Sequence, residues 1–171
     1  MSAVMENILV DARACHKCPM WRTRQNVVHY QGPAHPRVLF IGEAPGETED
    51  ATGLPFQGRA GRNLREKLRL LDARGISYGI TNVILCRPEA NRFEHRFGDN
   101  CLPFLNRTIE AVHPEVIVAL GKVAQFFVPQ VVSEAWAEDK LYRFLHPMAM
   151  GYNPKLWPRW DEDWQRLVEA L

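Results

Sequence analysis

The fold is decided by residues 38–61, which read VLFIGEAPGETEDATGLPFQGRAG. The stretch opens with an apolar run, Val38 to Ile41, that is short enough to be one buried strand. It leads into a segment in which Leu64, Leu68 and Leu71 recur at the spacing of an amphipathic helix. A connection this long between a strand and a helix is more often a functional site than a simple link. We therefore expect a functional loop between this strand and this helix.

Apolar runs and helical spacings alternate along the rest of the chain. Residues 116–120, for example, form a continuous apolar run, which is typical of a strand buried on both faces. We expect irregular structure at 21–36 and 89–100, where glycine, proline and polar residues gather. The predicted strands are 38–41, 80–85, 116–120 and 141–145. The predicted helices are 6–14, 62–73, about 102–112, 121–127 and a C-terminal one with Trp160, Trp164, Leu167, Val168 and Leu171 on one face.

Strands that alternate with helices predict an α/β fold with a mainly parallel sheet. We expect a single domain over residues 1–171, built as three αβα layers around a short, mainly parallel, four-stranded central sheet. Functional sites in such folds lie at the carboxyl ends of the strands. That rule brings the loop at 42–56, the segment Cys86-Arg87-Pro88, Gly121 and His146 to one edge of the sheet.

The composition is that of an ordinary globular protein, with 46% hydrophobic and 24% charged residues. The chain has no run of about eighteen apolar residues, so we expect no membrane span. Glu6 and Asp11 interrupt the apolar residues near the N-terminus, which is unlike a signal peptide. We expect a cytoplasmic protein that acts as a monomer.

Basic residues gather in two places although the formal net charge is only +1. Each cluster is either a solvated face or a surface that meets phosphates, and the charge pattern leaves both open. The first cluster comprises Arg59, Arg62, Arg65, Lys67 and Arg69, and the second comprises Arg87, Arg92 and Arg96.

The chain has four cysteines, of which Cys15 and Cys18 form a C-x-x-C pair while Cys86 and Cys101 lie far along the sequence. All four fall outside the interiors of the predicted strands and helices. Because disulfides are disfavoured in the cytosol, the pattern favours a metal site. Four thiolates suit either tetrahedral zinc or an iron–sulfur cluster, and spacing alone does not separate the two. A set with only one close pair is less typical of zinc.

Several short motifs follow one another in order over nearly the whole chain. They are Gly42-Glu43-Ala44-Pro45-Gly46 with Glu49-Asp50, Pro55-Phe56-x-Gly58-Arg59-Ala60-Gly61, Thr81-Asn82-Val83 with Cys86-Arg87-Pro88 and Asn91-Arg92, Cys101-x-Pro103-Phe104-Leu105, Leu120-Gly121-x-x-Ala124, and His146-Pro147 with Asn153-Pro154. Together they resemble the family 4 uracil-DNA glycosylases, the thermostable iron–sulfur type. The resemblance implies that Cys15, Cys18, Cys86 and Cys101 ligate a structural [4Fe–4S] cluster. It also implies a partner, uracil-containing DNA, either single- or double-stranded.

The implied reaction breaks the bond between deoxyribose and uracil, and the base leaves as an anion. The enzyme must flip the base out, recognise it and stabilise negative charge on its O2 atom. A neutral imidazole at His146 would donate to that atom. The carboxamide of Asn82 would accept from N3–H and donate to O4, a pattern that cytosine does not match. Phe56 would stack on the flipped ring.

The loop after the first strand would supply the remaining base contacts. Its backbone N–H groups can face the base, so we assign base-binding roles to Gly42, Ala44, Gly46 and Glu49. Better-known relatives place an Asp where this chain has Ala44. Glu43 is therefore the expected residue that positions the attacking water. Glu47 and Asp50 are expected to cap the loop or face solvent.

Five residues are expected to contact DNA, and one of them departs from the family pattern. The family has Ser directly after His-Pro, where this chain has Met148, which lacks the hydroxyl that can hold a DNA phosphate. The residues after Met148 keep the apolar character of a loop that wedges into the duplex. The expected DNA contacts are Gly58, Arg59, Gly61, Arg87 and Met148.

A second departure is the short segment between Gly121 and His146, which lacks the glycine-rich hairpin turn typical of the family. The last strand would then be truncated or replaced by helix, which would move His146. This leaves an alternative in which the chain is a catalytically weak or inactive uracil- or DNA-binding protein with the same fold and cluster. A zinc-stabilised nucleotide-binding protein is a further alternative, although no G-x-x-x-x-G-K-[ST] motif supports it.

Overall fold

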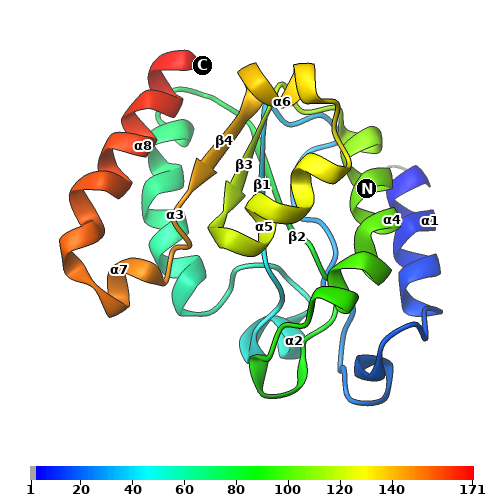
Figure 1. Cartoon of the computed structure of the whole chain (residues 1–171). Helices are drawn as coiled ribbons and strands as arrows, with labels where there is room; N and C mark the ends of the chain where they lie inside the picture. The colour runs from blue at the N-terminus through cyan, green and yellow to red at the C-terminus, as the bar shows by residue number, and fades with distance from the viewer. Residues whose placement is uncertain (1–2) are drawn as a thin grey trace.

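A computed structural model describes residues 3–171 and shows an all-parallel, four-stranded sheet. The strands lie in the order β2-β1-β3-β4 and are covered by helices on both faces (Figure 1). The prediction of a three-layer α/β fold is therefore confirmed. The strands are β1 (Val38–Gly42), β2 (Tyr78–Asn82), β3 (Val116–Leu120) and β4 (Leu141–Phe144).

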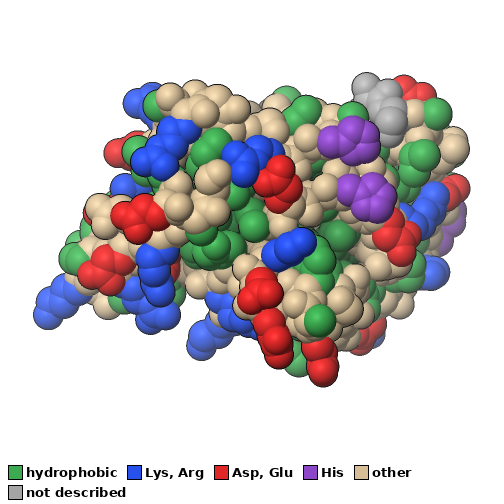
Figure 2. Space-filling view, turned by 90° about the horizontal axis from the view of Figure 1, so that it is seen from above, with side chains coloured by type: hydrophobic (Ala, Val, Ile, Leu, Met, Phe, Trp, Pro, Cys, Tyr) green, Lys and Arg blue, Asp and Glu red, His purple; other side chains and the backbone are tan. Residues whose placement is uncertain are grey.

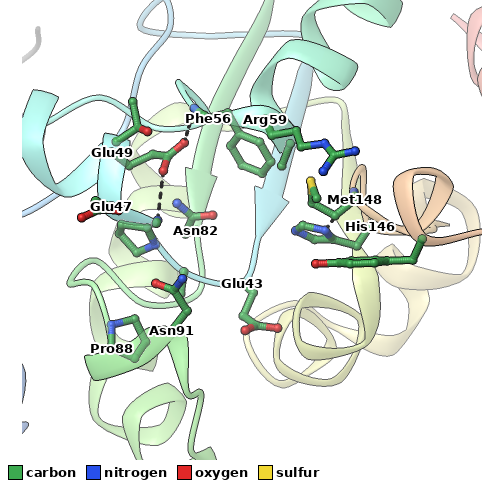
Figure 3. A pocket seen from close by; sticks show the side chains of 17 residues that line it. Glu43, Glu47, Glu49, Phe56, Arg59, Asn82, Pro88, Asn91, His146 and Met148 are labelled. Atoms are coloured by element: carbon green, nitrogen blue, oxygen red, sulfur yellow. Dashed lines mark hydrogen bonds between the residues drawn. The ribbon is translucent and has the colours of Figure 1, made fainter.

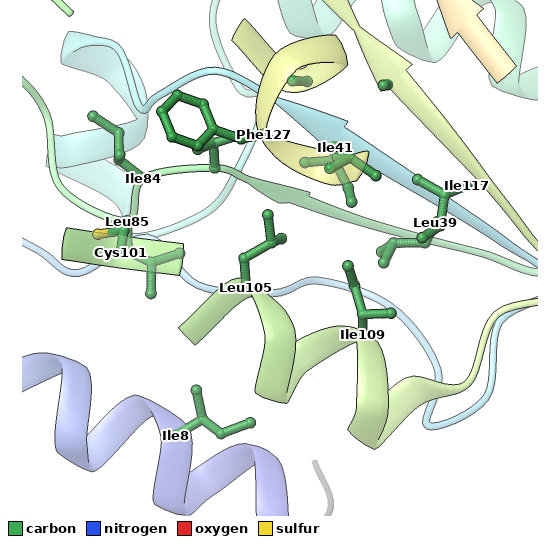
Figure 4. Packing of buried hydrophobic residues seen from close by; sticks show 14 of the residues in the cluster. Ile8, Leu39, Ile41, Ile84, Leu85, Cys101, Leu105, Ile109, Ile117 and Phe127 are labelled. Atoms are coloured by element: carbon green, nitrogen blue, oxygen red, sulfur yellow. The ribbon is translucent and has the colours of Figure 1, made fainter. Parts of the chain in front are cut away.

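Side chains alternate along β1 and so divide the core into two layers. Leu39 and Ile41 join the cluster on one face, under α4 (His95–Val112) and α5 (Gly121–Phe127), and Figure 4 shows part of this layer. The N-terminal helix α1 (Ala3–Arg13) packs on the outside of α4. Val38 and Phe40 join the opposite cluster, under α3 (Arg59–Asp72) and α8 (Trp157–Ala170).

The shorter helices lie mainly in the connections at the edges of the sheet. The chain from Val28 to Gln31 runs beside β2 and the segment after it. Gln31 N donates to Ile80 O of β2, and Val28 N donates to Leu85 O beyond the strand. No helix within residues 3–171 is long and apolar enough to cross a membrane. The short α-helices are α2 (Glu47–Thr52), α6 (Glu134–Lys140) and α7 (Ala149–Tyr152), and the 3-10 turns are Pro19–Arg22, Glu89–Asn91, Val128–Gln130 and Pro154–Leu156.

The predicted loop at 89–100 is wrong in its second half, because α4 begins at His95 rather than near residue 102. The segment is amphipathic: Phe97 and Cys101 are buried one turn apart, while His95, Arg96 and Asp99 are exposed. With so many polar residues, the first turn and a half of the helix resembles a loop in sequence. As a consequence Cys101 lies inside a helix, contrary to prediction.

Two other element boundaries differ from prediction. Strand β2 ends at Asn82 and not at residue 85, although Val83 N and Ile84 N still donate to Gly42 O and Glu43 O as the chain leaves the sheet. The loop after β1 contains a two-turn helix, α2, and α3 begins at Arg59, three residues earlier than expected. Helix α6 precedes a β4 of only four residues, as the shortened segment suggested.

The face at the amino ends of the strands, seen in Figure 2, intersperses basic and acidic side chains and gathers no single charge. Such a mixed surface offers no continuous track for a phosphate backbone.

A buried histidine links the sheet side of the core to α4. His29 Nε2 lies 3.0 Å from Thr108 Oγ1, and that hydroxyl donates to the Phe104 carbonyl at 2.8 Å. The hydroxyl proton is thus already used, so the imidazole carries its proton on Nε2. Nδ1 has no partner among the described residues. Burial, with the nearby charge of Arg107, lowers the pKa of His29 to about 4.

We expect the free energy of unfolding to fall as the pH drops from 6.5 to 4, with His29 contributing about 3 kcal/mol of the loss. In this window the unfolded chain binds a proton at His29 while the folded chain does not, so acid favours unfolding. Urea titrations across this range should show the gap between the wild type and a His29→Gln variant narrowing toward low pH. Parallel curves would contradict this assignment of the acid sensitivity.

Candidate active site

A cavity of about 500 Å³ lies at the carboxyl ends of the strands (Figure 3). It draws on segments that follow β1, β2 and β4, and it lies where the strand order reverses on either side of β1. Such switch points are the usual ligand sites of open parallel sheets. The lining residues are Glu43, Ala44, Pro45, Gly46, Glu47, Thr48, Glu49, Phe56, Gly58, Arg59, Ala60, Asn82, Pro88, Asn91, His146, Met148 and Tyr152.

The floor of the cavity depends on Gly42 at the end of β1. A Cβ atom at this position would lie 2.5 Å from Asn82 Oδ1 and 2.5 Å from Phe56 Cζ. Glycine is therefore required for these two side chains to approach each other. Gly42 does not line the cavity but sets the spacing of two residues that do.

Phe56 is held in an uncommon backbone conformation, with φ at 54°. Gly61 of α3 packs so tightly below it that a Cβ there would lie 1.6 Å from Phe56 O. Arg65 Nη2 donates to the same carbonyl at 3.0 Å. The aromatic ring therefore faces the cavity on a fixed backbone. Gly61 acts from beneath and does not itself reach the cavity.

Glu49 joins the two halves of the loop. Its Oε2 accepts from Gly46 N at 3.0 Å and its Oε1 accepts from Gly58 N at 2.7 Å. These glycines are the N-caps of α2 and α3, so one buried carboxylate closes both helix starts (Figure 3). Asp50 similarly accepts from Gln25 N at 3.1 Å, which agrees with its expected role as a loop cap.

Asn82 is almost fully buried at the end of β2, with 2% of its surface exposed. No other group among residues 3–171 hydrogen-bonds to its carboxamide. A buried amide without a partner is costly unless a ligand or water completes it. Its polar atoms face the cavity and are free for a bound molecule (Figure 3).

Asn91 is a cavity residue to which the sequence analysis assigned no role. Ala90 and Asn91 both have positive φ, at 50° and 55°, which turns the chain so that Asn91 reaches the cavity. Its Oδ1 accepts from Arg87 Nε at 3.1 Å, and this leaves the NH₂ group for a ligand. Its place in the Asn91-Arg92 motif was a sign of importance, but the paired left-handed residues have no sequence signature.

Arg87 does not line the cavity but lies partly buried beside it. Its Nη1 is 3.8 Å from Glu47 Oε1, and its Nε holds Asn91. In this structure Arg87 therefore ties the two sides of the rim together. Three other residues expected to contact DNA, Gly58, Arg59 and Met148, do line the cavity.

His146 lies in the cavity wall although the strand before it is short. Asn63 Nδ2 donates to Pro147 O at 2.8 Å and fixes the following turn to α3. Gly121 allows the close approach, since a Cβ there would lie 2.9 Å from His146 Cβ. The shortened segment therefore does not remove His146 from the site.

The protonation of His146 follows from its surroundings. Met148 N donates to His146 Nδ1 at 3.2 Å, so the neutral ring carries its proton on Nε2. Burial lowers the pKa of the imidazole below its ordinary value of 6.5, which keeps the ring neutral at pH 7. The site thus presents a neutral N–H donor. The role of Met148 here belongs to its backbone, which no side-chain motif would indicate.

Glu43 supplies a carboxylate that the protein does not otherwise use. It is half-buried in the cavity wall, and burial raises the pKa of its carboxyl group. It forms no ion pair within residues 3–171. By contrast, both oxygens of Glu49 are held by backbone amides.

The four cysteines gather between α1, α4 and the chain that leaves β2, around a second, smaller cavity. Within the described chain, no group of three or more His, Cys, Asp or Glu is arranged to hold a metal ion. The ligands of an iron–sulfur cluster surround several atoms and stand farther apart than those of one ion. Burial raises the pKa of Cys101 to about 12, so the thiolate of Cys101 needs a positive partner such as a metal group. Four sulfurs around one hollow fit such a group.

Comparison with known proteins agrees with this geometry. Residues 29–168 match the model of the uracil DNA glycosylase superfamily. The chain is 33% identical to a type-4 uracil-DNA glycosylase of Saccharolobus solfataricus, over 98% of this chain and 86% of the relative. It is 32% identical to the type-4 enzyme of Archaeoglobus fulgidus, over 96% and 92%. With the type-4 enzyme of Thermotoga maritima it shares 44% identity over 73% and 66%.

The match to the superfamily spans most of the chain, and the aligned relatives cover nearly all of it. The resemblance seen in the motifs is thereby confirmed. The chain belongs to the type-4 uracil-DNA glycosylase family of the uracil DNA glycosylase superfamily.

Proposed function

We propose that the protein is a monofunctional uracil-DNA glycosylase, which hydrolyses the bond between uracil and deoxyribose and leaves an abasic site. The observation that carries the proposal is the cavity in which an aromatic ring, an unpaired carboxamide and a neutral imidazole meet. Its volume, about 500 Å³, is within the range of small-molecule sites. The relatives' names support the same activity.

His146 stabilises the leaving group in this proposal. As the glycosidic bond breaks, its electrons move onto the base and negative charge builds on uracil O2. The Nε2 proton of His146, fixed by the bond from Met148 N to Nδ1, is available to that oxygen. A fixed donor in a water-poor site stabilises developing charge strongly because nothing has to reorganise during the reaction.

Asn82 and Phe56 select the base. The free carboxamide of Asn82 accepts from uracil N3–H and donates to O4, whereas cytosine reverses both demands. Phe56 stacks on the flipped ring, and Gly42 leaves the room between these two side chains. The backbone of Ala44 and Gly46 lines the same wall as Glu49, which holds it in place. Asn91 adds a donor from the opposite rim.

Glu43 positions the water that attacks the sugar. Its oxygens are free, whereas those of Glu49 close the loop and Glu47 Oε1 lies 3.8 Å from Arg87 Nη1. The sugar carries much positive charge when the base leaves, so the water needs orientation more than deprotonation. A carboxylate at Glu43 also offsets that positive charge.

DNA is expected to lie over the mouth of the cavity. Arg59 is exposed at the start of α3, with Gly58 beside it, and is placed to meet phosphates. Tyr152 projects from α7 at the rim with 82% of its surface exposed, which suits an aromatic wedge entering the space of the flipped base. Arg87 would contact the backbone from its paired position.

We further propose that Cys15, Cys18, Cys86 and Cys101 hold a [4Fe–4S] cluster, whose contribution is to tie α1, α4 and the loop after β2 together. All four thiols are free of disulfides, which suits a reducing cytoplasm. We expect residues 1–171 to act as one domain and as a monomer on DNA. Two apolar layers on one shared sheet support the single domain.

The test is incubation of purified, cluster-replete protein with an oligonucleotide that contains one uracil, followed by alkaline cleavage at abasic sites. Cleavage is expected at uracil, and a matched oligonucleotide with cytosine at that position should stay intact. Binding to the uracil strand with no cleavage above buffer would replace the enzyme proposal with the binding-protein alternative.

Gly42→Ala should lower kcat/KM for uracil excision by at least about tenfold, because one methyl group would enter the space between Asn82 and Phe56. Gly75→Ala is the matched control. Gly75 has positive φ, at 65°, so alanine there strains the backbone, but a Cβ atom meets nothing within 4 Å. It should lower the melting temperature and leave excision unchanged. Equal losses of activity in both variants would indicate a general effect on stability.

A further inference from the structure

Two side chains next to the cysteine cavity donate hydrogen bonds to sulfur. Arg24 Nη1 donates to Cys86 Sγ at 3.2 Å, and Asn100 Nδ2 donates to Cys18 Sγ at 3.3 Å. Neither residue belongs to the metal ligands or to the motifs of the sequence analysis. Both are partly buried, which strengthens a hydrogen bond relative to one in water.

Each donor makes a second bond to a backbone carbonyl of the N-terminal segment. Arg24 Nη2 donates to Arg13 O, at the end of α1, at 2.5 Å. Asn100 Nδ2 donates to Lys17 O, within the C-x-x-C loop, at 3.1 Å. Arg24 therefore joins Cys86 to the end of α1, just before Cys15. Asn100 joins the loop that carries Cys15 and Cys18 to α4, which carries Cys101.

We infer that Arg24 and Asn100 are positioning residues that act through the cluster proposed above: they hold the N-terminal cysteines against Cys86 and Cys101, and they stabilise negative charge on the cluster sulfurs. Hydrogen bonds to the sulfurs are among the factors that set the potential of an iron–sulfur cluster. Outer residues of this kind also set how tightly a metal group is kept.

Arg24 should have the larger effect. Its guanidinium is charged, and a charged donor forms a stronger bond than the neutral amide of Asn100. Its planar fork also reaches a sulfur and a carbonyl at once, which a lysine ammonium cannot reproduce with the same geometry. Both donors favour the reduced cluster, which carries one more negative charge, so their removal should lower the midpoint potential.

The experiment measures cluster properties and not DNA repair. In Arg24→Met, the ratio of reduced to oxidised cluster at a fixed potential should fall about tenfold, which is about 59 mV for a one-electron couple measured by film voltammetry. The visible absorbance of the cluster should bleach about tenfold faster in a chelator. Asn100→Leu should change both in the same direction by less, and Arg24→Lys should recover part of the loss.

Arg13→Met is the matched control for charge. It removes a positive side chain from the same region while it keeps the Arg13 carbonyl and both bonds of Arg24. Asn106→Leu is the control for an amide elsewhere on α4. If Arg24→Met does not fold, Arg24→Lys decides by the same two measurements.

The outcomes separate this inference from the proposals on which it rests. Wild-type protein without iron and sulfide would overturn the cluster and this inference together, while uracil excision would still be judged by its own assay. Iron-replete wild type, with Arg24→Met identical to Arg13→Met in potential and bleaching, would overturn this inference alone; where Arg24→Met does not fold, the same result for Arg24→Lys would overturn it.

Discussion

Replacing His146 with alanine should lower kcat for uracil excision by about two orders of magnitude, the usual loss when one fixed donor to a developing oxyanion is removed. The variant leaves Phe56 and Asn82 in place, so KM should change much less than kcat. Single-turnover kinetics on a uracil oligonucleotide measure this step directly. His35→Ala, an exposed histidine outside the cavity, is the control and should keep full activity.

The pH profile distinguishes a donor from a merely structural histidine. Burial lowers the pKa of His146, so the neutral ring persists as the pH falls through 6.5. Protonation at lower pH places a second N–H on Nδ1, opposite the Met148 N–H, and breaks the bond that orients the ring. Activity should therefore fall only below the ordinary histidine pKa. Full activity of His146→Ala would refute the assignment.

Local patterns predicted the parts of the fold that depend on local chemistry. The apolar run at β1 and the leucine spacing of α3 are both confirmed, because a buried strand and an amphipathic helix each carry their own periodicity. The beginning of α4 was missed because its exposed face is so polar that only Phe97 and Cys101 mark the buried side.

Local sequence patterns did not predict contacts between segments that are distant in the chain. Glu49 looked like a cavity acid, yet its two oxygens are committed to Gly46 N and Gly58 N, a bond pair that exists only once both helices have started. The left-handed backbone of Phe56 depends on Gly61 below it. The sequence could therefore predict which residues gather at the site. It could not predict which of them contact a ligand and which only hold the loop in place.

The position of His146 also depends on contacts between distant segments. The short segment before it suggested a displaced histidine, since the sequence offered no replacement for the missing hairpin. The structure supplies other supports: Asn63 fixes the following turn from α3, and Gly121 permits close packing. The sequence analysis placed Gly121 at the same edge of the sheet as His146, but it gave no indication that Asn63 would bond to the turn after His146.

Replacing Asn82 with alanine should lower kcat/KM for uracil by about a hundredfold, because the base would enter a site that no longer completes its N3–H and O4 bonds. Asn82→Asp should lose a similar amount, since the carboxylate accepts from N3–H but cannot donate to O4. Steady-state kinetics on the single-uracil oligonucleotide, with Asn106→Ala on α4 as a control outside the cavity, measure both effects.

Stability measurements on the same variants show whether Asn82 recognises the base or supports the fold. A structural asparagine that caps a turn would cost the protein about 1 kcal/mol or more when removed, because its partners would be left unpaired. Asn82 has no such partners among residues 3–171, so truncating it strands no donor or acceptor. The free energy of unfolding should therefore change little while excision collapses. A large loss of stability together with retained excision would instead make Asn82 part of the framework, and base selection would then have to come from Asn91 and the loop backbone.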